Sequence, residues 1–583
     1  MNALFVCLIV VFVGLWARLV CLQVFHHDKY AGLAQQQNTV RVPIPAQRGK
    51  IYDRRGEILA MSIPGRSIFA NPREIIDYRA ASDALAGALS LDGETLYAGL
   101  LAHNDKFFAW IKRMATPEEE AAVRALGLKG VYIREEPMRF YPSGRLAAQL
   151  VGFAGLDQHG LAGAEFAFDS RLSGADGWCE ETRDGRARGI RQPGRTFVPA
   201  VNGQSIVLTI DTNIQDFLEM AVDRCFEQYA PKSVTGIVMD PASGDILALA
   251  ERPTFDPNKY AEAPKDTWRL RSVTDTFEPG SMFKPYVFSG AFEQRIVRLS
   301  EIIFCGNGVF HVGERTLHDA HPYGNLSAED VVVKSSNIGM ARIGLRLGAP
   351  MTYAYLAAFG FGRPTGLPFP SEASGYLVPA RKWSDYTLTS VPMGHEVSVT
   401  AVQIAAAFSA IANGGHLLKP RILRGAIGPD GKVVEKNVGP EVVRRVITPE
   451  TSRVMTTEVL RKVVTDGTGR LADIDEYEIA GKTGTAQKLE GGLYSHSKYV
   501  SSFVCTGPVD SPRAVVLIVV DEPSRGASLF GGTVAAPQAA DVLRSTLDYM
   551  YIDSRRREKP ARMATATVAP VRAARTREVR NAP

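Results

Sequence analysis

The stretch YEIAGKTGTAQKLEGGLYSHSKYVSSFVCTGPVDSPRAVVLIVVDEP, residues 477–523, decides the fold class. Three runs in it, at 477–487, 499–509 and 513–523, predict three strands in succession. The segment that follows, AAPQAADVLRSTLDYMY at 535–551, predicts a helix. Consecutive strands with a helix packed beside them are typical of an α+β domain.

Upstream segments supply the rest of this domain. GQSIVL and the residues after it predict a strand at 205–210, then a helix that Asp211 or Thr212 caps. TGIVMDPASGDILALAE, residues 235–251, predicts a hairpin about the turn PASGD. Strands at both ends of a mostly helical middle predict one antiparallel sheet flanked by helices, over residues 201–552.

The first 25 residues predict a transmembrane anchor. MNALFVCLIVVFVGLWA carries no charge, and the apolar character continues past Arg18, which approaches the ~20 residues that span a bilayer as a helix. A cleaved signal peptide is the rival, but the bulky residues of LWARLVCLQVF do not resemble a cleavage site. The basic residues follow the span, so the positive-inside tendency would favour the opposite topology unless the true start lies further upstream.

Residues 26–200 predict an extended α+β region with many turns. Ile51 and Tyr52, then Ile58 to Met61, predict short strands around the turn DRRG, and Thr116 with Pro117 predicts the start of a helix. The last segment, 553–583, predicts a disordered basic tail, with nine Arg and Lys from residue 554 onward against two Glu. Without that tail the chain is close to neutral, which argues against a nucleic-acid-binding body.

Neither metal nor disulfide chemistry is indicated. The six cysteines form no C-x-x-C pair, so they predict neither a zinc site nor a disulfide framework. His311, His318 and His321 have no Glu or Cys ligand at a matching spacing, so we interpret them as loop or hydrogen-bonding residues. We therefore expect no metal and no cofactor.

EPGSMFKP, residues 278–285, places Ser281 and Lys284 three apart after a Pro-Gly turn. If a helix begins there, the free N–H groups of its first turn favour an oxyanion, and Lys284 lies on the face of Ser281. Pro285 is compatible with that helix only in its first turn. Lys284 could accept the serine proton only when neutral, so its pKa would have to fall far below 10.4 through burial or a neighbouring cation.

Two later motifs supply the groups that acyl transfer by a serine needs. KSSNIG provides Ser335 and Asn337, and AGKTGTAQ provides Lys482, Thr483, Gly484 and Thr485 on a predicted edge strand. Lys482 can lower the pKa of Lys284 and attract a substrate carboxylate, which the two threonine hydroxyls can bind. Gly484 keeps side-chain bulk away from a peptide lying along the strand.

Each motif alone has a plainer interpretation. Ser281 could simply cap a helix. A second S-x-x-K match, at Ser495 to Lys498, lies in the polar segment GGLYSHSKY and is interpreted as a solvated loop. The absence of a G-x-S-x-G elbow with a His-Asp pair removes the α/β-hydrolase alternative.

The ordered set S-x-x-K, S-x-N and K-T-G resembles that of the class B penicillin-binding proteins, with Ser336 where the usual S-D-N has Asp. RGKIYDRRGEILA resembles the family's pedestal motif, and DPASGDILALAERPTFDPN with EPGSMFKP resembles the start of its transpeptidase domain. The resemblance covers nearly everything between anchor and tail. It implies an α+β chain of anchor (1–25), pedestal or dimerisation-type domain (26–200), penicillin-binding/β-lactamase-like transpeptidase domain (201–552) and tail (553–583).

The resemblance also implies roles. Ser281 would attack the D-Ala-D-Ala bond of a peptidoglycan stem peptide, and the acyl group would pass to an amine of a neighbouring stem. Lys284 would be the base, Ser335 a proton relay and Asn337 a substrate-positioning amide. The backbone N–H groups of Ser281 and Thr485 would form the oxyanion hole, and β-lactams would acylate the same serine.

Family members of this kind are single-pass proteins of the bacterial inner membrane with the catalytic domain outside the cytoplasm. The segment 482–523 looks more like division-type than elongation-type members, although Cys505 and the GHE at 394–396 depart from the usual pattern. Glycan polymerisation would fall to a polytopic membrane glycosyltransferase partner, beside other division proteins. The alternatives are an elongation-type transpeptidase, a DD-carboxypeptidase or β-lactamase of the same fold, and a non-enzymatic division scaffold.

Overall fold

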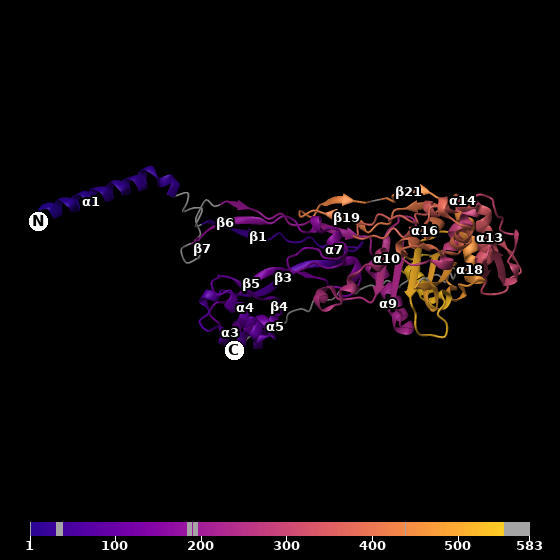
Figure 1. Ribbon diagram of the computed structural model, residues 1–583, viewed down its shortest axis with the longest axis horizontal. Helices are drawn as coiled ribbons and strands as arrows, with labels where there is room; N and C mark the ends of the chain where they lie inside the picture. The colour runs from indigo at the N-terminus through magenta and orange to yellow at the C-terminus, as the bar shows by residue number, and fades with distance from the viewer. Residues whose placement is uncertain are drawn as a thin grey trace, which may run out of the picture.

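A computed structural model describes residues 2–30, 39–183, 189–190, 196–437, 439–491 and 493–552. Figure 1 shows an elongated molecule, with α1 extending from one end and most of the C-terminal helices at the other. The predicted tail at 553–583 lies outside the described residues, so its disorder stays a prediction.

A five-stranded antiparallel sheet forms the centre of the C-terminal region, in the order β11-β10-β24-β23-β22. The predicted hairpin is confirmed as β10 (Ser233–Met239) and β11 (Ile246–Arg252). The three successive strands are confirmed as β22 (Ala480–Glu490), β23 (Leu493–Gly507) and β24 (Ala514–Asp521). β22 lies at the edge of the sheet, as the sequence predicted.

Both faces of this sheet are buried. Alternate residues of β24 belong to two different apolar clusters, Val515 and Leu517 to one, Val516 and Ile518 to the other. The first cluster includes α16 (Ala401–Ala412), and the second includes α9 (Thr212–Tyr229) and α20 (Ala536–Tyr549). Burial on both faces explains why β24 is an unbroken apolar run rather than an alternating one.

The predicted helix starts of the C-terminal region are confirmed. Asp211 caps α9 by accepting a hydrogen bond from Asn213 N, after β9 (Ser205–Leu208). The other helices are α10 (Arg271–Thr274), α11 (Lys284–Glu293), α12 (Ala328–Val333), α13 (Asn337–Leu347), α14 (Ala349–Ala358), α15 (Asp385–Ser390), α17 (Pro449–Val454), α18 (Arg461–Thr465) and α19 (Gly531–Val534). Short strand pairs lie between them: β12 (Ile302–Phe304) with β15 (Asn325–Ser327), β13 (Val309–Val312) with β14 (Arg315–His318), β16 (Tyr376–Leu377) with β17 (Val397–Ser398), and β18 (His416–Leu418) with β21 (Val442–Arg445).

The N-terminal region contains a longer strand than the sequence predicted. β2 is Ile51–Tyr52 as expected, but β3 runs from Ile58 to Ala70 rather than ending at Met61. Pro64 and Gly65, which signal a turn, lie inside it because Pro64 pairs with Pro137 of β5 (Val131–Phe140). A Cβ at Gly65 would lie 2.9 Å from both Met114 and Met138, so the small residue permits close packing there.

The remaining N-terminal elements are short helices and strands. The helix predicted at Thr116 and Pro117 is α5 (Pro117–Leu126), which begins with a capping box between Thr116 and Glu119. The others are β1 (Thr39–Ile44), α3 (Tyr78–Leu89), α4 (Gly93–Ala102), β4 (Ala109–Ala115), α6 (Ala148–Val151), α7 (Gly163–Ala167), α8 (Asp169–Leu172), β6 (Gly177–Arg183), β7 (Gly189–Ile190) and β8 (Phe197–Val198).

One sheet crosses between the two regions. Its order is β20-β19-β9-β2-β3-β4, with β5 also paired to β3, and β2 runs parallel to β9. β19 (Leu423–Ile427) and β20 (Val433–Lys436) come from the C-terminal region, whereas β2 to β5 come from the N-terminal region. The domain boundary predicted near residue 200 thus falls just before β9, whose neighbours belong to both regions.

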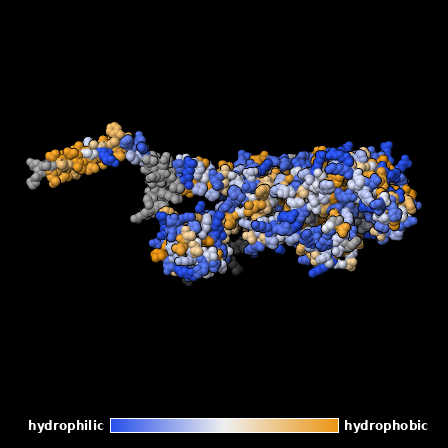
Figure 2. Space-filling model, in the orientation of Figure 1, coloured by the Kyte–Doolittle hydropathy of each residue, from blue (hydrophilic) through white to orange (hydrophobic). Residues whose placement is uncertain are grey.

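The N-terminal helix has the length and composition to cross a membrane. α1 (Asn2–Val20) continues through a π-helical turn, Cys21–Phe25, to give an apolar span at Leu4–Phe25 with a mean hydropathy of 2.6. None of that span is buried against the rest of the protein, and Figure 2 shows it as a mostly hydrophobic rod. This exposure fits the predicted membrane anchor, because a core helix of a water-soluble protein would be covered.

Candidate active site

The EPGSMFKP segment forms a 3-10 turn, Gly280–Phe283, that runs directly into α11. Gly280 has φ +53°, a conformation that glycine adopts easily. Pro285 lies in the first turn of α11, where its missing N–H costs nothing. Ser281 is partly exposed whereas Lys284 is fully buried. The turn therefore leaves Ser281 partly accessible and keeps Lys284 inside.

Lys284 Nζ contacts the S-x-N segment. It donates hydrogen bonds to Ser335 O (2.6 Å), Ser335 Oγ (3.2 Å) and Asn337 Oδ1 (2.9 Å). Burial lowers the pKa of Lys284 from 10.5 to about 7, against a smaller opposing effect of the Asp319 carboxylate. Much of the amine is therefore neutral near physiological pH, which a general base requires.

Ser335 and Asn337 lie at the junction of α12 and α13. Ser335 has φ +58°, a left-handed conformation that a non-glycine residue rarely adopts and that clusters at functional sites. Ser336 caps α13 by accepting a hydrogen bond from Gly339 N. Ser336, which stands where the usual motif has Asp, therefore stabilises the start of α13.

Asp319 belongs to this site although the sequence did not identify it. Its carboxylate accepts hydrogen bonds from Ser336 Oγ (2.6 Å), Asn337 N (2.5 Å) and Ile338 N (3.0 Å). It therefore holds the start of α13, and with it the Asn337 side chain, in place. In the sequence Asp319 lies in HDAH, residues 318–321, which matches no known motif, so no local signal identified it.

The K-T-G-T segment lies on the edge strand β22. Lys482 is fully buried, and its Nζ donates to Ser335 Oγ (3.1 Å) and to Thr483 O (3.0 Å). The Thr483 hydroxyl shares a 2.6 Å hydrogen bond with that of Thr468, and the Thr485 hydroxyl accepts one from Gly531 N (3.0 Å). A Cβ at Gly484 would lie 2.8 Å from Met282 Cγ, so this glycine lets the Gly280–Phe283 turn pack against β22.

Ser335 Oγ is the point where the three motifs meet. It accepts hydrogen bonds from both Lys284 and Lys482, at 3.2 and 3.1 Å. Burial, and then the charge of Lys284, lower the pKa of Lys482 well below its usual 10.5. Two buried ammonium groups beside one hydroxyl repel each other, so the pair loses its first proton readily.

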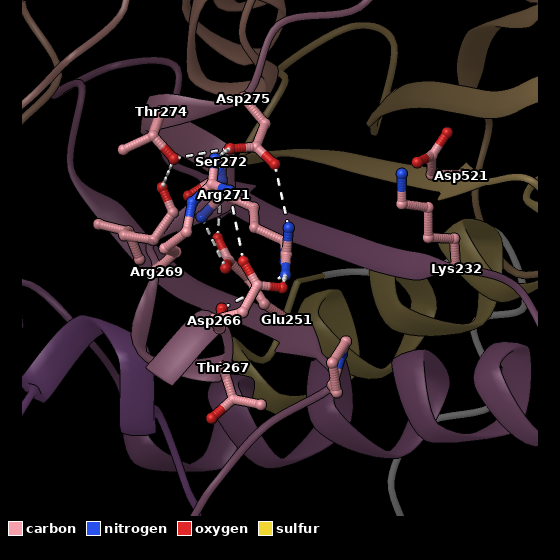
Figure 3. Close-up of polar contacts among 12 residues, drawn as sticks. Lys232, Glu251, Asp266, Thr267, Arg269, Arg271, Ser272, Thr274, Asp275 and Asp521 are labelled. Atoms are coloured by element: carbon pink, nitrogen blue, oxygen red, sulfur yellow. Dashed lines mark hydrogen bonds and ion pairs between the residues drawn. The ribbon is translucent and has the colours of Figure 1, made fainter. Parts of the chain in front are cut away.

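The start of α10, which precedes the Gly280–Phe283 turn, is held by the buried carboxylate of Glu251. Glu251 of β11 accepts hydrogen bonds from Arg271 N (2.8 Å) and Ser272 N (2.7 Å) at the start of α10, and Figure 3 shows this contact beside the ion pairs of Asp275. Burial raises the pKa of Glu251 to about 7. A cavity of about 540 Å³ lies between this segment and the sheet, with Asp521 on its far wall.

Other sequence candidates lie elsewhere. Ser495 to Lys498 is not a loop, because it lies in the first part of the 15-residue strand β23. The polar residues of GGLYSHSKY predicted a loop, but they form the outer end of this strand. His311 Nδ1 is within hydrogen-bonding distance (2.9 Å) of Thr316 Oγ1, and the described residues contain no cluster of three metal-ligating side chains. Cys505 is buried in the cluster that includes α9 and α20.

The arrangement has the parts of a serine acyl-transfer site. A partly exposed hydroxyl lies one turn from an amine whose pKa is about 7, and a second hydroxyl bridges that amine to another buried lysine. The strand beside them, β22, is the edge strand of the sheet, and an extended peptide can align beside an edge strand.

Comparisons with known proteins show the family to which the chain belongs. The family model described as "Penicillin binding protein transpeptidase domain" matches residues 234–544, and that of the "Penicillin-binding Protein dimerisation domain" matches residues 43–208. The chain is 34% identical over 536 residues to the probable peptidoglycan D,D-transpeptidase PbpC of Pseudomonas aeruginosa, covering 92% of each chain. It is 33% identical to the stage V sporulation protein D of Bacillus subtilis, covering 94% of this chain and 85% of that one.

A solved structure shares the fold. Penicillin-binding protein 3 of Mycobacterium tuberculosis, in complex with aztreonam, superposes with a TM-score of 0.69 at 28% identity, over 88% of this chain and 98% of that one.

Proposed function

The chain belongs to the class B penicillin-binding proteins, and from this premise we propose that it is a peptidoglycan D,D-transpeptidase with Ser281 as its nucleophile. One observation carries the proposal: Lys284, one turn after the partly exposed Ser281, and Lys482 converge on Ser335 Oγ. Stem peptides ending in D-Ala-D-Ala are the substrate, with no metal and no cofactor.

In the acylation step, neutral Lys284 takes the proton of the Ser281 hydroxyl. The serine oxygen then forms a bond to the carbonyl carbon of the penultimate D-Ala. The negative charge on the carbonyl oxygen faces the N–H groups of Ser281 and Thr485. When the C–N bond breaks, the proton passes from Lys284 through the Ser335 hydroxyl to the departing D-Ala amine.

Substrate binding falls to the other residues of the set. The terminal carboxylate faces Lys482 and the hydroxyls of Thr483 and Thr485, and the Asn337 amide positions the peptide. Gly484 leaves room along β22 for the substrate backbone. The amine of a neighbouring stem then attacks the ester carbon, its proton goes to Lys284, and Ser281 leaves with a proton as the new peptide bond forms.

A fluorescent penicillin tests the proposal, because β-lactams mimic D-Ala-D-Ala and acylate the same serine. We expect the full-length protein in detergent to gain one penicillin mass located at Ser281, and Ser281→Ala to gain none. Ser495→Ala is a matched control, since it removes the serine of the second S-x-x-K match.

The lifetime of the adduct separates the alternatives. An adduct stable for minutes supports a transpeptidase, whereas one lost within seconds supports a β-lactamase. Release of D-Ala from a stem peptide without an acceptor amine would identify carboxypeptidase activity. No adduct at all would contradict the enzyme and favour the division scaffold.

We further propose a role in septal synthesis during division. The support is the resemblance of segment 482–523 to division-type members; elongation-type synthesis is the alternative. Fluorescent fusions that concentrate at midcell before constriction would support division, and a signal dispersed along the side wall would support elongation.

The predicted location is the bacterial inner membrane, crossed once by α1, with the catalytic region outside the cytoplasm. The exposed apolar span Leu4–Phe25 supports the anchor. Deletion of residues 1–30 should release the protein from membranes without slowing penicillin acylation.

A polytopic glycosyltransferase and other division proteins are the proposed partners. Co-purification of the full-length protein in detergent would test this proposal.

A further inference from the structure

The Glu278 carboxylate, three residues before Ser281, joins three separate segments of the chain. Its Oε2 lies 3.1 Å from His395 Nδ1, and its Oε1 accepts hydrogen bonds from Glu396 N (3.0 Å) and Tyr494 OH (3.4 Å). Because a carboxylate accepts hydrogen bonds, His395 donates from Nδ1. The side chain is only 16% exposed, so these donors replace most of its water.

The loop that carries His395 packs directly against the nucleophile turn. Gly280 N donates to Gly394 O (3.1 Å), and Phe277 and Val399 exchange two backbone hydrogen bonds of 3.0 Å. Gly394 has φ +84°, and a Cβ there would lie 2.1 Å from Gly280 O. The loop is therefore bonded to the chain on both sides of Glu278.

The loop backbone is strained at the residue that Glu278 holds. Glu396 has φ +60°, which is rare for a residue with a side chain and costs free energy. Its N–H donates to Glu278 Oε1. This hydrogen bond to Glu278 thus offsets part of the free-energy cost of the Glu396 conformation, which the loop would otherwise tend to leave.

Tyr494 brings the start of β23 to the same cluster. Its ring meets that of His395 edge to face, with centroids 5.3 Å apart. Burial, followed by the charges of Glu278 and Glu396, raises the pKa of Tyr494, so its hydroxyl stays protonated as a donor. Its 3.4 Å hydrogen bond is longer than those of His395 and Glu396.

We propose that Glu278 and His395 are a positioning pair that fixes the backbone of residues 278–281 and thereby aims the Ser281 N–H at the oxyanion. The proposal rests on the proposed function, since it concerns the same acylation step. Neither residue transfers a proton: both Glu278 oxygens already have donors, and the buried amine of Lys284 supplies the base. Their effect is on geometry, and a small displacement of an oxyanion donor slows acylation without weakening binding.

Three variants test the pair by stopped-flow acylation with a fluorescent penicillin. The measurement separates the acylation rate constant from the dissociation constant of the initial complex. His395→Ala should lower the rate constant about tenfold and change the dissociation constant less than about twofold. His395→Asn should recover most of the rate, because the Asn amide nitrogen is the same number of bonds from Cβ as Nδ1 of His.

Tyr494→Phe is the matched control, because it removes only the longest of the three hydrogen bonds and keeps the ring contact. We expect it to stay within about twofold of wild type. A His395→Ala variant that acylates at the wild-type rate, or whose loss lies entirely in the dissociation constant, overturns the proposal. So does a His395→Asn variant as slow as His395→Ala.

Hydrogen exchange of the peptide that contains residues 278–282 provides a readout that needs no acylation. His395→Ala should raise its exchange rate while Tyr494→Phe leaves it unchanged. Unchanged exchange in both variants contradicts the positioning role even if the protein is active. A wild-type protein that penicillin does not acylate would overturn the proposed function. The exchange data would still show whether His395 and Glu278 fix the backbone of residues 278–281.

Discussion

A lysine that accepts a proton must first lose its own charge, and burial is the main reason that Lys284 can do so. Its amine is fully covered, and an ammonium group in that position has lost its water. From the sequence, either burial or a neighbouring cation could lower the pKa of Lys284. In the structure burial dominates for Lys284, while repulsion between the lysines adds to the lowered pKa of Lys482.

The pH dependence of acylation should follow Lys284. Its pKa is lowered from 10.5 to about 7, so the amine is mostly protonated below pH 7 and mostly neutral above it. The acylation rate constant of the wild type should therefore rise with pH, with a midpoint near 7, and reach a plateau above about pH 8. Penicillin acylation measured from pH 5.5 to 9.5 checks this; a rate still rising steeply at pH 9.5 would contradict it.

Replacement of Lys482 should affect substrate binding more than this profile. Burial, against the opposing effect of the Asp319 carboxylate, sets the pKa of Lys284, so Lys482→Ala should leave the midpoint near pH 7. Loss of the cation that faces the substrate carboxylate should weaken the initial complex several-fold. Lys488→Ala is a control, because its charge is paired with Asp521 and Glu522 and lies further along β22. A Lys482→Ala variant that forms the initial complex as tightly as wild type would refute its role in binding the carboxylate.

At the scale of elements, the site depends on how closely the nucleophile turn approaches β22. A Cβ at Gly280 would lie 3.1 Å from Thr485 O, and one at Gly484 would lie 2.8 Å from Met282 Cγ and 3.1 Å from Pro279 O. The two glycines thus set the distance between the N–H groups of Ser281 and Thr485, which are the proposed oxyanion donors.

Gly484→Ala should therefore push the turn away from the strand. We expect a loss of about 1–3 kcal/mol in the free energy of unfolding and at least a tenfold slower acylation. Chemical denaturation and stopped-flow acylation measure the two effects. Gly87→Ala in α3 is the control: a Cβ there has no atom within 4 Å, so it should stabilise the protein by about 0.5–1 kcal/mol. Wild-type kinetics in Gly484→Ala would show that the contact is not needed.

At the scale of the whole molecule, the shared sheet makes the N-terminal region continuous with the catalytic one. Asp53, in the turn between β2 and β3, is the clearest link. It is fully buried, and it accepts hydrogen bonds from Arg55 N (2.7 Å) and Glu57 N (2.8 Å) in its own turn and from Thr212 Oγ1 (2.7 Å) at the start of α9.

Asp53→Ala should leave these donors without their buried acceptor and weaken the contact between the two regions. The expected cost is about 2–3 kcal/mol in the free energy of unfolding. Asp430→Ala is the matched control, because Asp430 accepts a comparable turn hydrogen bond from Lys432 N on an exposed hairpin and should cost less than about 1 kcal/mol. Equal costs in the two variants would show that Asp53 does not join the regions.

Much of the fold could be predicted from local signals. The strands 235–251 and 477–523, the capped helices α5 and α9 and the apolar N-terminal span each depend on residues close in sequence, and all are present in the structure. β3 was predicted too short because Pro64 and Gly65 are turn signals locally, and only pairing with β5 makes them part of a strand.

The sequence by itself determined the chemical groups of this protein and their order, because serine, lysine, asparagine and glycine carry their chemistry wherever they lie. It could not determine what those groups contact, since contacts such as Asp319 with Asn337 and Glu278 with His395 join residues 18 and 117 positions apart. The tertiary structure alone buried Lys284 and Lys482 around one hydroxyl, and burial is what changes an ordinary lysine into a base.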